Sequence, residues 1–195
     1  GCLDIKLADQ YADPDAITTT DTARELLASA YNSLPRYQME FSILSDDFVP
    51  TNLAGKYADL LNLYNWQEKA IDDLSDNIWN EYYMTIAIVN ALLPRIGNIN
   101  PKDEADRLEV EKIRCEAKAL KAMCYFDLLR LYGPVYSQKN LDKEGIILKN
   151  RLELDFLPRS SVQDCVKEIE TLLSEAAAVA NAREEVFYLS TSTVK

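Results

Sequence analysis

The residue types that enzymes use most are missing or scattered in this chain. There is no histidine among the 195 residues, which removes Ser-His-Asp and Cys-His catalysis, imidazole metal sites and the usual general base near neutral pH. The three internal cysteines, Cys115, Cys124 and Cys165, form no Cys-x-x-Cys pair and are most simply small buried hydrophobic residues. The adjacent acids Asp46 and Asp47 are more typical of turn caps than of catalysis. We therefore expect no enzyme activity, no metal site and no cofactor.

The residues best suited to hold a ligand lie in the irregular stretch 36–70. Aromatic and amide side chains mix there with a proline and a glycine, and no hydrophobic period persists. A connection this long is usually functional or is ordered by its own turns. Aromatic faces stack on sugar rings or apolar ligands, while amides and carboxylates orient hydroxyl groups. The candidate ligand-binding residues are Asp47, Asn52, Tyr57, Tyr64 and Trp66. The alternative is that Tyr64 and Trp66 only pack the stretch onto the core.

Cys2 is a second candidate site, of a different kind. It is preceded only by Gly1 and begins an aperiodic leader, residues 1–19. Secreted lipoproteins start at a cysteine that is acylated after the signal peptide is removed, often just behind a small residue. The residues alone leave two interpretations open: a lipid-anchor cysteine, or a chance cysteine behind an added glycine.

The element that must organise these sites is a helix predicted over residues 107–134. It carries two apolar stripes on opposite sides, so helices must cover it on both. Gly133 is predicted to end it in the left-handed conformation, and Pro134 cannot continue it. The first stripe comprises Val110, Ile113, Ala117, Leu120, Cys124, Leu128 and Leu131, and the second Cys115, Ala119, Ala122, Phe126 and Leu129.

Two helices are predicted before this central one. The first, about residues 22–34, has Thr22 and Glu25 at capping-box spacing. The second, about 72–96, is joined to the central helix by a short turn, so the two should be antiparallel neighbours. Pro94 should weaken its last turn, and Asn90 beside its apolar stripe is expected to be a buried hydrogen-bonding residue.

The last full helix is predicted over residues 161–181, with Ser161 and Asp164 at capping positions. Before it, residues 146–148 form a short strand or simply anchor a loop. The final residues, 190–195, have the pattern of a cap and first turn of a further helix. We therefore expect the chain to be a fragment of a longer protein.

The overall composition favours one globular domain. Hydrophobic residues make up 48% of the chain, which makes disorder improbable. The net charge of −11 argues against a nucleic-acid partner. No stretch reaches the ~20 apolar residues that span a bilayer. Helices of two lengths in antiparallel pairs predict an all-α, tetratricopeptide-like right-handed superhelical array with long irregular loops. Ala122, Phe126 and Pro134 have the spacing of the second helix of such a repeat, but the first-helix signature is absent.

Four blocks of residues, in order, resemble one family. The chain starts with Cys2, Leu3 and Asp4, and its first helix ends in the run 30–32, Ala-Tyr-Asn. The second block is Trp79, Tyr82, Tyr83, Ile86, Asn90, Leu92 and Leu93. The third comprises Glu116, Ala117, Ala119, Leu120, Lys121, Ala122, Tyr125, Phe126 and Leu128, closing with Leu131, Tyr132, Gly133, Pro134 and Val135. The fourth is Pro158, Arg159, Ser160 and Ser161.

These blocks resemble the N-terminal part of the SusD/RagB-like outer-membrane lipoproteins of Bacteroidetes. The chain departs from the pattern at Lys121, where arginine is usual, and at Tyr136, where proline is common. The resemblance implies a lipid-anchored, surface-exposed protein of the outer membrane that captures nutrients, usually glycans, for a TonB-dependent SusC-like transporter. Cys2 matches the acylated cysteine, so the only membrane contact implied is its lipid. Residues 1–19 would be a leader, and 20–195 a helical domain truncated before its C-terminal part.

A different function remains open beside this one. Paired helices also suit a tetratricopeptide-like scaffold that grips a peptide or partner protein. Such a protein would use an exposed ridge along the central helix, and the candidates are Arg114, Lys118, Lys121, Tyr125 and Tyr132. The simpler interpretation of the same residues is an ordinary solvated edge.

Overall fold

The structure is a computed structural model that describes residues 17–35, 76–150 and 157–192. These ranges contain four α-helices and one 3-10 turn: α2 (Thr20–Asn32), α5 (Asp76–Ile96), α6 (Glu104–Tyr132), η2 (Gln138–Asn140) and α7 (Val162–Ser192). Within them the only β-type pairing is a single bridge between Glu144 and Ser161. The all-α class is therefore confirmed, and the superhelical array stays a prediction.

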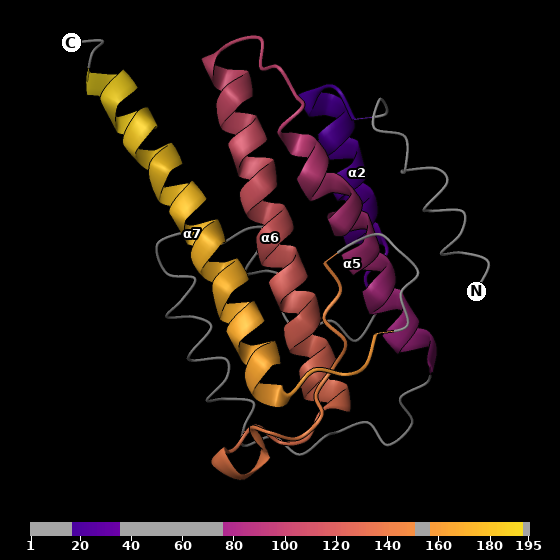
Figure 1. The fold of residues 1–195 in the computed structure, drawn as a ribbon. Helices are drawn as coiled ribbons and strands as arrows, with labels where there is room; N and C mark the ends of the chain where they lie inside the picture. The colour runs from indigo at the N-terminus through magenta and orange to yellow at the C-terminus, as the bar shows by residue number, and fades with distance from the viewer. Residues whose placement is uncertain (1–16, 36–75, 151–156, 193–195) are drawn as a thin grey trace.

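Helix α6 lies in the middle of the array. Figure 1 shows α7 on one side of it and α5, with α2 behind, on the other, and each of these long helices runs antiparallel to the next along the chain. Both apolar stripes of α6 are buried. On one side the Cys115 thiol donates to the Ala176 carbonyl of α7 at 3.2 Å, and on the other Asp127 accepts from Tyr82 of α5 at 2.7 Å. The prediction that helices cover α6 on both sides is confirmed.

The beginning of α2 differs from the prediction. The helix starts at Thr20, and the N-cap is Thr19 instead of Thr22. The Thr19 hydroxyl accepts from the Thr22 amide at 3.2 Å, while the Thr22 hydroxyl accepts from the Thr19 amide at 3.1 Å. A threonine at the third helical position thus closes the capping box where glutamate was expected, because its hydroxyl reaches the same backbone amide. At α7, by contrast, the predicted cap is confirmed, since the Asp164 amide donates to Ser161 Oγ at 3.1 Å.

One predicted helix end is right in position but wrong in conformation, and another is wrong in position. Gly133 does end α6, but with φ −85° and ψ 170°, which is extended backbone and not the left-handed conformation. Glycine is needed there for space, because a Cβ at this position would lie 2.7 Å from the Leu129 carbonyl oxygen. Helix α7 continues to Ser192, past the predicted end at 181 and through the supposed start of a further helix. Its sequence contains neither glycine nor proline, so nothing local stops it.

Candidate functional site

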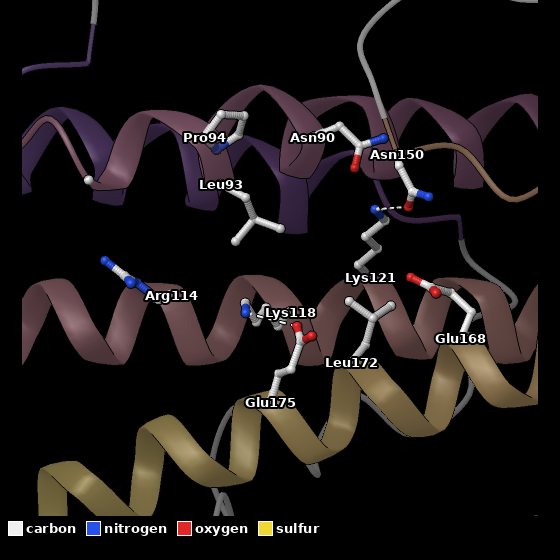
Figure 2. A pocket seen from close by; sticks show the side chains of 11 residues that line it. Asn90, Leu93, Pro94, Arg114, Lys118, Lys121, Asn150, Glu168, Leu172 and Glu175 are labelled. Atoms are coloured by element: carbon white, nitrogen blue, oxygen red, sulfur yellow. Dashed lines mark hydrogen bonds and ion pairs between the residues drawn. The ribbon is translucent and has the colours of Figure 1, made fainter.

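A groove of about 520 Å³ lies between α5, α6 and α7, and it is the candidate site among the described residues (Figure 2). Its floor comes from α6 and its walls from α5 and α7, while Asn150 lies at one end. This size is within the range of small-molecule pockets, roughly 300–1,000 Å³. The lining residues are Asn90, Leu93, Pro94, Gly97, Arg114, Lys118, Lys121, Asn150, Glu168, Leu172 and Glu175.

Three cations form the floor. Arg114, Lys118 and Lys121 are spaced four and three residues apart on α6 and therefore share one side of the helix. Lys118 Nζ pairs with Glu175 Oε2 of α7 at 2.9 Å. Arg114 lies 3.7 Å from Glu111 of its own helix, a distance and exposure at which an ion pair contributes little. The predicted ridge is only partly exposed: Lys121 and Tyr125 are 4% and 0% exposed, whereas Arg114, Lys118 and Tyr132 are half-buried. The packing of α5 and α7 on either side turns the expected ridge into the bottom of a groove.

Lys121 is the most constrained of the three. Its Nζ donates to Asn150 Oδ1 at 3.2 Å and lies 5.7 Å from the centre of the Tyr125 ring. Burial removes water from the ammonium group and lowers the pKa of Lys121 to about 8, while the charges of Glu168 and Glu175 act in the opposite direction. The side chain is therefore still charged at pH 7, in a place where its described hydrogen-bond partner is a neutral amide.

The segment that carries Asn150 is held by side chains instead of by a neighbouring strand. The Tyr83 hydroxyl of α5 donates to the Ile147 carbonyl at 2.7 Å and accepts from the same residue's amide at 3.0 Å. Two residues on, the Tyr125 hydroxyl of α6 does the same for Lys149, at 2.7 Å and 2.9 Å. Each hydroxyl thus satisfies both polar groups of one extended residue. The alternative in which residues 146–148 anchor a loop is the one that the structure bears out.

Asn90 completes this attachment from the groove wall. Its Nδ2 donates to the Lys149 carbonyl at 2.9 Å, and the residue is 5% exposed, so the predicted role as a buried hydrogen-bonding residue is confirmed. Pro94, one turn later, has no N–H, so the Asn90 carbonyl receives no helical hydrogen bond from that position. Asn90 therefore holds the segment before Asn150 and lines the groove wall at the same time.

The motif residues that carry the family resemblance meet below the groove. The Trp79 ring lies 4.8 Å from the ring of Tyr83 and 5.0 Å from that of Tyr132, and the Arg159 guanidinium is 5.0 Å from its centre. Arg159 also donates to the Gly145 carbonyl at 3.4 Å. Three blocks that are distant in sequence thus form one aromatic contact, which joins α5, α6 and the start of α7. Because these side chains contact one another across the elements, we assign them a structural role.

A second charged cluster, around the buried Glu116, is used within the fold. Arg24 of α2 pairs with Glu109 and Glu116 of α6, the latter at 2.7 Å, and the Tyr31 hydroxyl donates to Glu116 at 3.2 Å. This cluster fastens α2 to α6. Burial and the charge of Glu116 raise the pKa of Tyr31, so the phenol stays protonated as a donor.

The ligand-binding residues predicted from the sequence are not described by the structure. Asp47, Asn52, Tyr57, Tyr64 and Trp66 all lie in the range 36–75, and Cys2 lies in 1–16. Their roles stay predictions.

The groove, in turn, was missed by sequence reasoning. Its cations were identified but placed on an exposed ridge, and Glu168 and Glu175 were not singled out. The sequence did contain a signal for these two residues. Glu168, Leu172 and Glu175 follow one another at steps of four and three residues, which places all three on one side of α7.

Two searches of the described residues bear on other functions. In the ranges 17–35, 76–150 and 157–192, no cluster of three or more histidine, cysteine or acidic residues is arranged to hold a metal ion. The helices in these same ranges are not long and apolar enough to cross a membrane.

In a comparison with known protein families, one family matches nearly the whole chain. A family model described as "Starch-binding associating with outer membrane" matches residues 4–194. No curated protein and no solved structure matches the chain. The family match covers the four motif blocks, except for Cys2 and Leu3 of the first block.

Proposed function

This chain belongs to the SusD-like family, and from that premise we propose that it is a lipid-anchored nutrient-binding protein of the outer membrane. It would bind an oligosaccharide at the cell surface and deliver it to a TonB-dependent SusC-like transporter. The observation that carries the proposal is the family match over residues 4–194, since the family is described as starch-binding and as associated with the outer membrane. That description is of binding and not of catalysis.

The stretch 36–70 would supply the ligand platform. A sugar ring presents apolar C–H faces and polar hydroxyl edges, so a site needs aromatic rings beside amides and carboxylates. Trp66, Tyr57 and Tyr64 would stack on the ring faces, and Asp47 and Asn52 would orient the hydroxyls. The helices described above are well suited to be the rigid support for such a platform, because α6 is buried on both sides.

Calorimetric titration of the full chain with maltoheptaose, a starch fragment, tests this proposal. We expect binding, and we expect Trp66→Ala and Asn52→Ala each to weaken it about tenfold or more, equivalent to about 1.4 kcal/mol. Asn98→Ala is the matched control for Asn52→Ala, because Asn98 is an exposed amide in the turn after α5. Affinity retained in both site variants would contradict the site and leave the family untouched.

A broader screen covers the possibility that the nutrient is not starch. If maltoheptaose does not bind, a glycan array of neutral and charged oligosaccharides should identify a ligand. Absence of binding to any glycan on that array would contradict the proposed function itself.

A further inference from the structure

We propose that the groove between α5, α6 and α7 is a ligand site for a carboxylate-bearing saccharide, with Lys121 and Arg114 as its cationic anchors. The inference goes beyond the nutrient proposal, because it rests on the described groove residues and on no residue of the stretch 36–70. It also differs in ligand class, since starch carries no charge.

The cations are arranged along a line that suits a ligand larger than a simple ion. Lys121 follows Arg114 by seven positions in α6, which corresponds to about 10 Å along the helix axis. Figure 2 shows Arg114 towards one end of the groove and Lys121 beneath Asn150 towards the other. Both residues have N–H groups that can donate to a ligand. Arg114 Nε is buried without a hydrogen-bond partner among the described residues. Lys121 has three N–H bonds, and its described acceptor is Asn150.

Among the residues that the structure describes, Lys121 is the cation of the groove that has no carboxylate in contact. Lys118 pairs with Glu175 at 2.9 Å and Arg114 lies 3.7 Å from Glu111, whereas Lys121 donates to the neutral Asn150 amide oxygen at 3.2 Å. A ligand with one negative charge would give Lys121 the charged hydrogen-bond acceptor that a buried ammonium group needs.

The rest of the lining fits a polyhydroxylated ring. Asn90 uses its Nδ2 on Lys149, which leaves its amide oxygen for a hydroxyl, and the half-buried Glu168 carboxylate is a second acceptor. Leu93 and Leu172 provide apolar contact for C–H groups. The described residues that line the groove include no aromatic side chain, so the affinity that they provide comes from charge-assisted hydrogen bonds instead of ring stacking.

A carboxylate fits better than a phosphate. Phosphate sites typically use the backbone amides at a helix N-terminus, but the α7 residues in this groove, from Glu168 on, lie beyond the first turn of a helix that begins at Val162. A phosphate dianion would also exceed the one positive charge, that of Lys121, which has no carboxylate in contact among the described residues. The lining therefore favours a uronate, a sugar whose C6 is a carboxylate.

The test compares two ligands that differ only in that group, methyl glucuronide and methyl glucoside. Each is titrated into the full, isotope-labelled chain at pH 7 while backbone amide resonances are followed. We expect glucuronide to shift amides of residues 114–121 and to bind at least tenfold more tightly than glucoside. Inorganic phosphate serves as a third ligand and should bind more weakly than glucuronide. Equal affinity for the two glycosides, tighter phosphate binding, or no shifts in these amides would overturn the proposal.

Two variants with opposite expected effects on glucuronide affinity keep the test decisive even if one of them folds poorly. Lys121→Met keeps the buried stem without its charge and should weaken glucuronide binding at least tenfold. Glu168→Gln removes a repelling charge and should strengthen it by a factor of about two to five. Lys112→Gln removes a charge from α6 outside the groove and should change nothing. A uniform response of all three variants would refute the assignment of the anchors.

Discussion

Lys121 places a positive charge on a side chain that is 4% exposed, beside a neutral amide oxygen and a tyrosine ring. A buried charge without a carboxylate in contact costs stability, because the protein replaces water only in part. Such a residue is easier to explain as part of a binding site than as part of a scaffold, since perturbed ionisable groups cluster at functional sites. Arg24 differs from Lys121 in this respect, because its charge is paired with two carboxylates within the fold.

We predict that Lys121→Met is more stable than the parent protein at pH 7, by up to roughly 3 kcal/mol. The pKa of Lys121 is about 8 in the folded chain against the model-compound value of 10.5, so between these values the unfolded state holds a proton that the folded state has lost. The parent's stability therefore rises with pH from about 8 to 10.5 through this group. The advantage of the variant should be greatest below pH 8 and should fade by pH 10.5.

Urea denaturation of both proteins from pH 6 to 10.5 measures this difference. Among the described residues that line the groove, the charged groups besides Lys121 are Arg114 and Lys118 from α6 and Glu168 and Glu175 from α7, while those from α5 are uncharged. These groups, and the buried cysteines and tyrosines, are common to both proteins. Their contributions to the pH dependence therefore cancel, to first order, in the difference between the two unfolding free energies. A stability difference that stays constant with pH would show that Lys121 does not titrate as described. Lys112→Met, outside the groove, should show no such trend.

At the scale of the element, α6 depends on close contact at its C-terminal end as well as along its two buried faces. Its last turn closes when the Gly133 amide donates to the Leu129 carbonyl at 2.9 Å, and the chain then leaves the helix in an extended conformation. Tyr125 of the same helix and Tyr83 of α5 bind the backbone of Lys149 and Ile147. The position of Asn150 over the groove therefore depends on how these two helices pack.

We predict that Gly133→Ala destabilises the protein by about 1–3 kcal/mol, the usual cost of overpacking. The new Cβ would lie 2.7 Å from the Leu129 carbonyl oxygen and 2.8 Å from its Cδ1, and the backbone atom cannot move without opening the last turn. Gly97→Ala is the matched control, since nothing lies within 4 Å of a Cβ there. Thermal and urea unfolding should separate the two variants clearly. Equal stabilities would mean that the end of α6 adjusts freely.

At the scale of the whole molecule, the described helices are the support in the proposed function, and the proposed ligand-binding residues lie in the stretch 36–70, outside the described residues. The family match extends over residues 4–194 and so includes both kinds of segment. Attachment to the outer membrane, in the proposed function, depends on acylation of Cys2. One or more acyl chains bind a bilayer with about 0.8 kcal/mol for each buried CH₂ group.

We predict that Cys2→Ala releases the protein from the membrane fraction of cells that process lipoproteins, while the parent protein stays with it. The loss should be accompanied by loss of radioactive palmitate incorporation. Cys124→Ala, at a fully buried position of α6, is the control and should leave both properties unchanged. Membrane attachment that persists in Cys2→Ala would contradict the anchor, as would a precursor sequence without a lipoprotein processing site before Cys2.

The sequence by itself determined the helices, the central place of α6 and the family, because hydrophobic period, capping residues and ordered motif blocks are local properties of the chain. Even so, the cap at Thr19 and the end of α7 were misplaced, since two hydroxyl residues compete for one cap and no breaker marks residue 181. Only the tertiary structure decided the groove. Lys121, Asn90 and Glu168 come from three helices, and whether a cation on α6 meets water or a neighbouring helix depends on packing that no local spacing encodes.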